Sequence, residues 1–158
     1  MGMSDQTWKR HANPLSVWTR VPVLPLLALA IWSRAWIGVW CLLPIGMLVV
    51  WTVFNPRAFP IPVSTDNWAS KATFGERVWL NRKTVPIPAH HDRFSLLLNI
   101  GTTLGIIPLA YGLFEYNLWA TLLGLVVVVG GKLWFLDRMV WLYQDMKDEN
   151  ADYASWLY

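Results

Sequence analysis

The sequence is short of charged residues. Asp, Glu, Lys and Arg make up 15% of its 158 residues, whereas apolar residues make up 55%. A soluble domain carries roughly 25% charged residues, so this chain has too few polar side chains to coat a globule in water. Its apolar residues gather in two blocks, 21–54 and 94–136, separated by a long polar stretch. This pattern excludes an ordinary soluble domain and predicts an all-α integral membrane protein.

Groups that carry common chemistries are scarce as well. Cys41 is the only cysteine and lies in a hydrophobic run, which excludes an intrachain disulfide and a thiolate metal cluster. The sequence has no GxSxG nucleophile motif, and no glycine-rich loop precedes a helix as in a phosphate site. The net charge of +3 is too small to favour nucleic acid as a partner. We therefore expect no cofactor and no nucleic-acid partner.

The second apolar block is long enough for two membrane-spanning helices, each of which needs roughly 17 to 25 residues. It predicts a helix over 94–114, a turn at 115–117 and a helix over 118–136.

The first block is tighter, and its first helix is expected to start early. Asn13 suits the N-cap and Pro14 the first helical position, where proline's missing N–H costs nothing. This predicts helices over 14–32 and 36–54, with Arg34 in a tight turn between them. Kinks are expected at Pro22 or Pro25 in the first helix and at Pro44 in the second. The alternative is a re-entrant hairpin that does not cross the bilayer.

The prediction is thus a bundle of four transmembrane helices in a single membrane domain. It comprises a hairpin at 14–54, a polar loop at 55–93, a second hairpin at 94–146 and an acidic tail at 147–158. Of the 13 Lys and Arg residues, Arg34 alone falls in a connection opposite the termini and the loop. Positive residues mark the cytoplasmic side, so both termini and the loop should be cytoplasmic in a multi-pass protein of the inner (plasma) membrane.

Tryptophan is abundant, with twelve residues. Indole prefers the membrane boundary, where its ring is apolar and its N–H stays wet. We expect lipid-interface positions for Trp18, Trp51 and Trp134 at the inner boundary, for Trp32, Trp36 and Trp119 at the outer one, and for Trp68 and Trp79 in the loop.

The polar loop contains an internal repeat, PIPxxxD, at 60–66 and 86–92. Alternating prolines favour extended backbone and an aspartate suits an N-cap, so each copy should be a strut ending in a helix cap; a shared ligand site is the alternative. The helix between the copies is expected to lie in the membrane interface or to pack under the bundle. Its basic residues could contact anionic lipid headgroups. Beyond the last helix we expect a frayed, solvated tail.

Helix packing has a pattern of its own. Gly101 and Gly105 form a small-xxx-small pair, which allows close approach of another helix, either within the chain or in a homodimer. Asn99 is expected to hydrogen-bond between helices.

For an enzyme, the candidate catalytic residues are His90, His91, Asp92 and Glu76, with Asp66 and His11 as further titratable groups on the same side. Adjacent histidines are expected to point in different directions, so a metal site would need ligands from elsewhere. No HxxxH, HxxE or CxxC pair supplies them, and we expect no metal.

Four segments, HANPLSVW at 11–18, DNWASK at 66–71, GERVWLNR at 75–82 and DRMVWLY at 137–143, carry a family resemblance. They resemble an uncharacterised family of small prokaryotic integral membrane proteins, a domain of unknown function, over roughly residues 11–145. The resemblance implies the membrane class and no particular activity.

The sequence as a whole favours a non-catalytic accessory or scaffolding membrane component. Its expected partners are the lipid bilayer and another membrane protein. One alternative is a membrane-bound enzyme acting on a lipid or amphipathic substrate at the cytoplasmic face. The other is a small dimeric transporter assembled through Gly101 and Gly105.

Overall fold

The computed structural model describes residues 3–158, which form helices and connecting turns without a β-strand. The helices are α1 (Asp5–His11), α2 (Pro14–Trp18), α3 (Val23–Trp32), α4 (Arg34–Ile37), the short 3₁₀ helix η1 (Gly38–Cys41), α5 (Leu42–Ala58), α6 (Trp68–Leu80), α7 (Ala89–Leu104), α8 (Ile106–Phe114), α9 (Leu118–Met146) and α10 (Ala151–Ala154).

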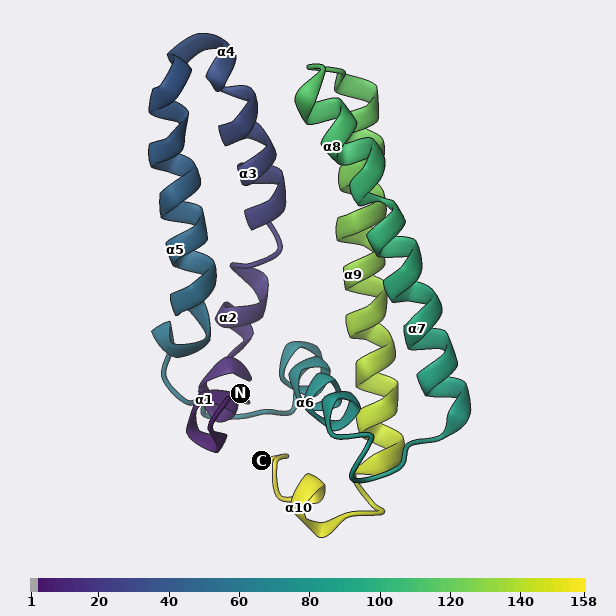
Figure 1. The fold of residues 1–158 in the computed structure, drawn as a ribbon. Helices are drawn as coiled ribbons and strands as arrows, with labels where there is room; N and C mark the ends of the chain where they lie inside the picture. Colours follow the sequence, from purple (N-terminus) through teal and green to yellow (C-terminus); the bar gives the residue numbers. More distant parts are fainter. Residues whose placement is uncertain (1–2) are drawn as a thin grey trace.

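The first hairpin pairs α3 with α5, which lie side by side and are joined over α4 and η1 (Figure 1). Asn13 caps α2 by accepting a hydrogen bond from the Leu15 N–H at 2.9 Å, and Pro14 is the first helical residue, as the sequence predicted. The chain leaves the helical path between α2 and α3, next to Pro22, because proline cannot donate to the preceding turn. Pro44 lies in the first turn of α5, where no helical N–H is needed.

The second hairpin pairs α7 and α8 with α9 (Figure 1). The predicted turn at 115–117 is present, and the Asn117 side chain accepts from the Ala120 N–H at 3.0 Å to cap α9. The helix α7 begins at Ala89, before the predicted start of the hairpin at 94, and α9 continues to Met146, where the second hairpin was predicted to end.

Three helical stretches are long and apolar enough to cross a membrane, at Pro14–Ala58, Ala89–Phe114 and Leu118–Met146. The first of them includes the reversal between α3 and α5. Large apolar side chains on these stretches face outward, with Met47 and Val126 each 70% exposed and Trp119 78% exposed. Exposed apolar surface of this extent is typical of helices that contact lipid or another protein.

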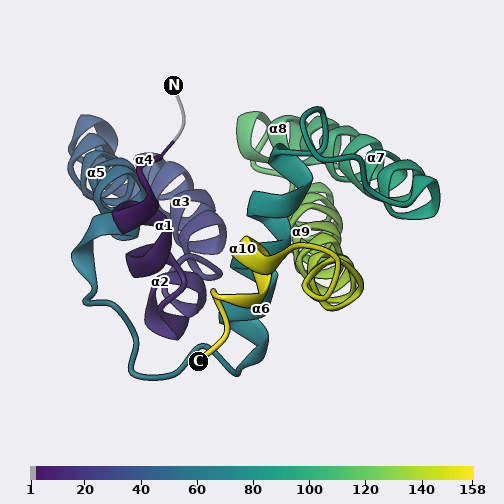
Figure 2. The same cartoon turned by 90° about the horizontal axis from the view of Figure 1, so that it is seen from below.

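At one end of the hairpins, α6 lies between them, together with α1, α10 and both ends of the described chain (Figures 1 and 2). We call this the α6 end and the opposite end the far end. The buried core of the chain is here, where Phe74 and Val78 of α6 pack against Met139, Leu142 and Tyr143 of α9. The α6 helix is therefore packed under the bundle, one of the two arrangements expected from its sequence.

Gly75 sets how closely α6 approaches α9. A Cβ atom at this position would lie 1.8 Å from the backbone oxygen of Met139. Only glycine allows the two backbones to touch in this way.

The two PIPxxxD repeats lead into helices, but their aspartates are not the caps we expected. Asn67 caps α6, accepting from the Ser70 N–H at 2.9 Å, while Asp66 pairs with Lys71, whose ammonium lowers the pKa of the Asp66 carboxyl. Asp92 lies inside the first turn of α7. Asp66 thus lies just before the N-cap of α6, and Asp92 lies past Pro88, the N-cap of α7.

The expected frayed tail is wrong. Tyr153 is buried in the core, and the Tyr158 N–H donates to the Thr65 hydroxyl at 2.9 Å. In return, the Thr65 N–H donates to the Tyr158 carbonyl at 2.8 Å. The tail is thus tied to the loop that precedes α6, because its aromatic residues outweigh its acidic ones in deciding where it packs.

At the far end, Arg34 joins the two hairpins. Its guanidinium donates to the Leu113 and Phe114 carbonyls at 2.6 and 2.9 Å and to the Tyr116 hydroxyl at 2.7 Å. These carbonyls belong to the last turn of α8, which has no helical donors for them and carries the negative end of the helix dipole. Arg34, which was expected in the turn of the first hairpin, therefore holds the two hairpins together; we call these hydrogen bonds the Arg34 clamp.

Candidate functional site

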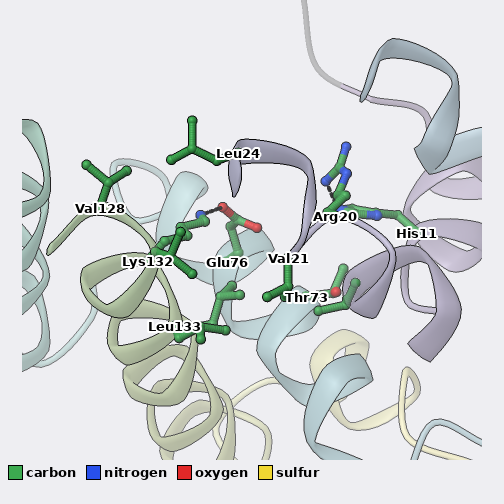
Figure 3. A pocket seen from close by; sticks show the side chains of 12 residues that line it. His11, Arg20, Val21, Leu24, Thr73, Glu76, Val128, Lys132 and Leu133 are labelled. Atoms are coloured by element: carbon green, nitrogen blue, oxygen red, sulfur yellow. Dashed lines mark hydrogen bonds and ion pairs between the residues drawn. The ribbon is translucent and has the colours of Figure 1, made fainter. Parts of the chain in front are cut away.

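A cavity of about 230 Å³ lies near the α6 end, bounded by α2 and α3 on one side, α9 on the other and α6 at its base (Figure 3). Its walls are apolar and include Val21, Leu24, Val128 and Leu133. Its polar lining consists of His11, Arg20, Thr73, Glu76 and Lys132. Four separate segments of the chain thus supply one concave site with a polar base and apolar walls.

His11 begins a chain of hydrogen bonds that leads away from the cavity. Arg20 Nη1 lies 3.0 Å from His11 Nε2, and because a guanidinium can only donate, Nε2 is the acceptor. His11 Nδ1 then carries the ring proton and donates to the Ser16 hydroxyl at 2.8 Å. Ser16 donates to Asn55 Oδ1 at 2.7 Å, and Asn55 Nδ2 donates to the Thr19 hydroxyl at 2.9 Å.

Every donor in this chain has an acceptor when the imidazole is neutral. Burial, together with the positive charge of Arg20, lowers the pKa of His11 from 6.5 to about 4, against a smaller opposing effect of Glu76. Ser16 and Asn55 are completely buried. The network therefore holds Arg20 in place and joins the α1–α2 segment to α5.

The hydrogen bond between His11 and Ser16 runs in the opposite direction to the one that activates a serine nucleophile. A general base must accept the serine proton, whereas His11 donates to the Ser16 hydroxyl. Its second nitrogen is covered by Arg20, and Ser16 has no exposed surface. This arrangement serves to position groups rather than to attack a substrate.

Arg20 is the uncompensated charge of the cavity. It is half-buried, and within residues 3–158 no carboxylate lies within 4.0 Å of its guanidinium. Its Nε is shielded from solvent and has no hydrogen-bond partner in the described chain. A half-buried cation without an anion carries a desolvation cost that an anionic ligand would remove.

The other two charges of the cavity neutralise each other. Lys132 Nζ lies 2.8 Å from Glu76 Oε1, so these residues form an ion pair between α9 and α6 (Figure 3). Arg77, the residue after Glu76 in the sequence, pairs with Asp5. With His11 neutral, the lining has a net positive charge supplied by Arg20.

The residues expected for an enzyme do not form one site. Asp92 pairs with Arg82, with 3.0 Å between Oδ1 and Nε, and Glu76 lies in the cavity. The two histidines, expected to point apart, instead have ring centroids 4.2 Å apart. His91 Nε2 lies 2.8 Å from Oδ2 of Asp145, which belongs to the last turn of α9.

The glycine pair and Asn99 also have specific positions. A Cβ at Gly105 would lie 2.5 Å from Cγ1 of Val127 on α9, so this glycine serves packing within the chain, whereas Gly101 faces open space. Asn99 donates to the Ser95 carbonyl of its own helix at 2.9 Å and not to a second helix as we expected.

The predicted boundary tryptophans fall near both ends of the hairpins. Trp36 and Trp119 at the far end are 74% and 78% exposed. Trp18 stacks on Trp68 near the α6 end, with ring centroids 5.5 Å apart. The other predicted positions are partly or largely exposed: Trp32, Trp51, Trp79 and Trp134.

Sequence reasoning missed the cavity itself. Its residues come from separate parts of the sequence, so no local pattern connects them. The one available signal was the segment at 11–18, whose His, Asn and Ser all prove to be buried and hydrogen-bonded.

These observations define an all-helical chain with three stretches able to cross a membrane and a cavity between its two hairpins. The chain belongs to a family of unknown function, DUF6653, whose model matches residues 1–156. This confirms the resemblance to an uncharacterised family and extends it beyond residues 11–145. No curated protein and no solved structure matches the chain.

Proposed function

We propose that the protein is a multi-pass integral membrane protein of the inner membrane with four spans, formed by α2–α3, α5, α7–α8 and α9. The outward-facing apolar side chains of these helices support this, because bilayer contact removes the cost of exposing them to water. The positive-inside rule puts the α6 end and both termini in the cytoplasm, with α6 packed at the inner boundary.

Cysteine labelling tests this topology directly, because Cys41 is the only native cysteine. In a Cys41→Ser background, Lys83→Cys places a thiol on an exposed residue at the α6 end and Glu115→Cys places one on an exposed residue at the far end. A membrane-impermeant maleimide applied to intact cells should label only the second variant. Labelling of the first, or of both, contradicts the orientation.

The proposed function is non-catalytic: the protein holds an anionic membrane lipid by its headgroup in the cavity between the hairpins, as an accessory component of the membrane. The observation that carries this proposal is the position of Arg20, a half-buried cation that lines an apolar-walled cavity and has no carboxylate partner among residues 3–158.

The shape of the cavity fits one end of a lipid. Its volume of about 230 Å³ lies below the roughly 300–1,000 Å³ of pockets that enclose a whole drug-sized ligand. It therefore suits a headgroup and the adjoining part of an acyl chain. Val21, Leu24 and Val128 would line that chain, and the remainder would lie in the bilayer beside the hairpins.

The charges favour a phosphate or carboxylate over a zwitterion. Arg20 supplies a positive charge to the lining, and Lys132 can bind an anion through the hydrogens that it does not share with Glu76. A zwitterionic headgroup would bring a second cation into a lining that is already positive. We therefore expect preference for lipids with net negative charge.

Native mass spectrometry of the protein released from nanodiscs tests the preference. In discs with equal amounts of phosphatidylglycerol and phosphatidylcholine, we expect one retained phosphatidylglycerol per chain. Arg20→Gln should reduce its retention at least about fivefold, since a near-surface cation contributes about 1 kcal/mol to binding of an anionic lipid.

The matched control is Arg57→Gln, which removes an exposed arginine from the end of α5 at the same side of the molecule. Its lipid retention should equal that of the unmodified protein. Equal losses in the two variants would show that general surface charge, and not the cavity, binds the lipid. Equal retention of the two lipids by the unmodified protein would contradict the proposal outright.

A further inference from the structure

A second cluster of chemically competent side chains lies away from the cavity, where the first turn of α7 meets the last turn of α9. His90 and His91 come from α7 and Asp145 from α9. One ligand atom from each of the three lies within 4.8 Å of the others. The lipid-binding proposal makes no use of this cluster.

Packing of the two helices creates the arrangement. His91 is buried, with 7% of its surface exposed, and its Nε2 lies 2.8 Å from Asp145 Oδ2. The His90 ring lies against the His91 ring, tilted by 38°, and is exposed on its other side. One imidazole is thus fixed by its surroundings and the other is free to adjust.

The neighbouring charges leave Asp145 available. Asp92, the next acid along α7, is engaged by Arg82. In the part of the chain that the structure describes, Asp145 has no lysine or arginine within 4.0 Å, and His91 is its one ion-pair partner. A carboxylate that faces two imidazoles and no fixed cation is a natural ligand for a metal ion.

The spacing suits a small divalent transition metal. With metal–nitrogen and metal–oxygen bonds of about 2.0–2.2 Å, ligand atoms in a tetrahedral site lie roughly 3.3–3.6 Å apart. Nε2 of His91 and Oδ2 of Asp145 need to separate by less than 1 Å to reach this distance. The third ligand can follow by rotation of the exposed His90 side chain.

We propose that His90, His91 and Asp145 bind one divalent transition metal ion of the zinc class. Two imidazoles and one carboxylate suit Zn²⁺, Co²⁺ or Ni²⁺ and not Mg²⁺ or Ca²⁺, which prefer oxygen ligands alone. Three protein ligands leave a fourth position to water.

A bound ion would also join α7 to α9 at the α6 end. A ligand that binds the folded state alone raises stability by mass action, so added Zn²⁺ should raise the unfolding temperature of the protein. This readout needs no assumption about activity or about the lipid site.

The test is Co²⁺ and Zn²⁺ titration of the detergent-purified protein carrying a tag without histidine. We expect one Co²⁺ per chain, visible-region absorption typical of a tetrahedral site, and displacement of Co²⁺ by Zn²⁺. Asp145→Asn and His90→Ala should each weaken binding by at least about tenfold, the scale of losses at metal sites. Both residues are exposed, so these variants should fold.

Asp148→Asn is the matched control, because it removes an exposed carboxylate just beyond α9 without touching the cluster. It should bind as the unmodified protein does. No stoichiometric binding, or equal affinity in Asp145→Asn and the unmodified protein, overturns the proposal. Losses in Asp148→Asn as large as those in Asp145→Asn would assign binding to general negative charge and overturn it equally.

Discussion

Replacing Gly75 by alanine should destabilise the protein more than any other glycine-to-alanine change on α6 or α9. The new methyl group would lie 1.8 Å from the Met139 backbone oxygen and 2.4 Å from its carbonyl carbon. Real Cβ atoms essentially never approach another atom within 3.0 Å, so α6 and α9 would have to separate by about 1.2 Å. No side-chain rotation can relieve this contact, because the opposing atoms belong to the backbone.

The expected cost follows from two opposing effects. Overpacking a tightly packed interface costs about 1–3 kcal/mol, and here the upper value applies because the clash involves a helix backbone. Alanine gains about 1 kcal/mol over glycine in helix propensity. The net loss is about 2 kcal/mol, which corresponds to a fall of roughly 4–8 °C in the unfolding temperature for a chain of this length.

Thermal unfolding in mild detergent, followed by circular dichroism, measures the effect. Gly130→Ala is the control, because a Cβ at Gly130 on α9 meets no atom within 4 Å and should leave stability unchanged or slightly raised. If Gly75→Ala unfolds at the temperature of the unmodified protein, α6 and α9 do not touch as described. The same conclusion follows if the unfolding temperatures of Gly75→Ala and Gly130→Ala fall by the same amount.

Three further predictions concern separate contacts. The pKa of His11 is about 4 in the folded state against 6.5 in the unfolded state, so the stability that the neutral imidazole provides, up to about 3 kcal/mol, is complete above pH 6.5 and is lost by pH 4. The difference in unfolding free energy between the unmodified protein and His11→Asn, measured by denaturant unfolding, should therefore shrink as the pH falls. A difference that does not change with pH would contradict a neutral imidazole. Arg34→Gln removes charged hydrogen bonds to the end of α8 and should cost about 1.5–3 kcal/mol in the same assay, with an unchanged value refuting the clamp. Thr65→Val leaves polar groups at Tyr158 unpaired and should speed proteolysis of the tail without affecting the hairpins, whereas unchanged cleavage would refute the docking.

Hydropathy and capping rules predicted where helices form but not all of their limits, since the helix expected over 36–54 is α5 at Leu42–Ala58. The helices of the second hairpin and the turn at 115–117 followed from the length of an apolar run, and the start of α2 followed from Asn13 and Pro14. These features depend on neighbouring residues, which is why one sequence reveals them.

The sites could not be predicted in the same way, because they depend on how the hairpins and α6 pack. Glu76 and Lys132 are separated by 56 positions, and His91 and Asp145 by 54. The residues next to one member of such a pair in the sequence give no information about the other member. The prediction of a frayed tail was wrong for the same reason. The acidic residues of the tail are visible in the sequence, but the surface on which its aromatic residues pack forms only when α6 packs on α9.

The backbone contact between Gly75 and Met139 has a mechanical consequence. It joins α6 and α9 without any intervening side chain that could rearrange, so the base of the cavity and one of its walls behave as a single rigid piece. The opposite wall, with Val21 and Leu24, belongs to the first hairpin, which Arg34 fastens at the far end. A bulkier ligand would therefore require movement of the first hairpin, which would separate Trp18 from Trp68.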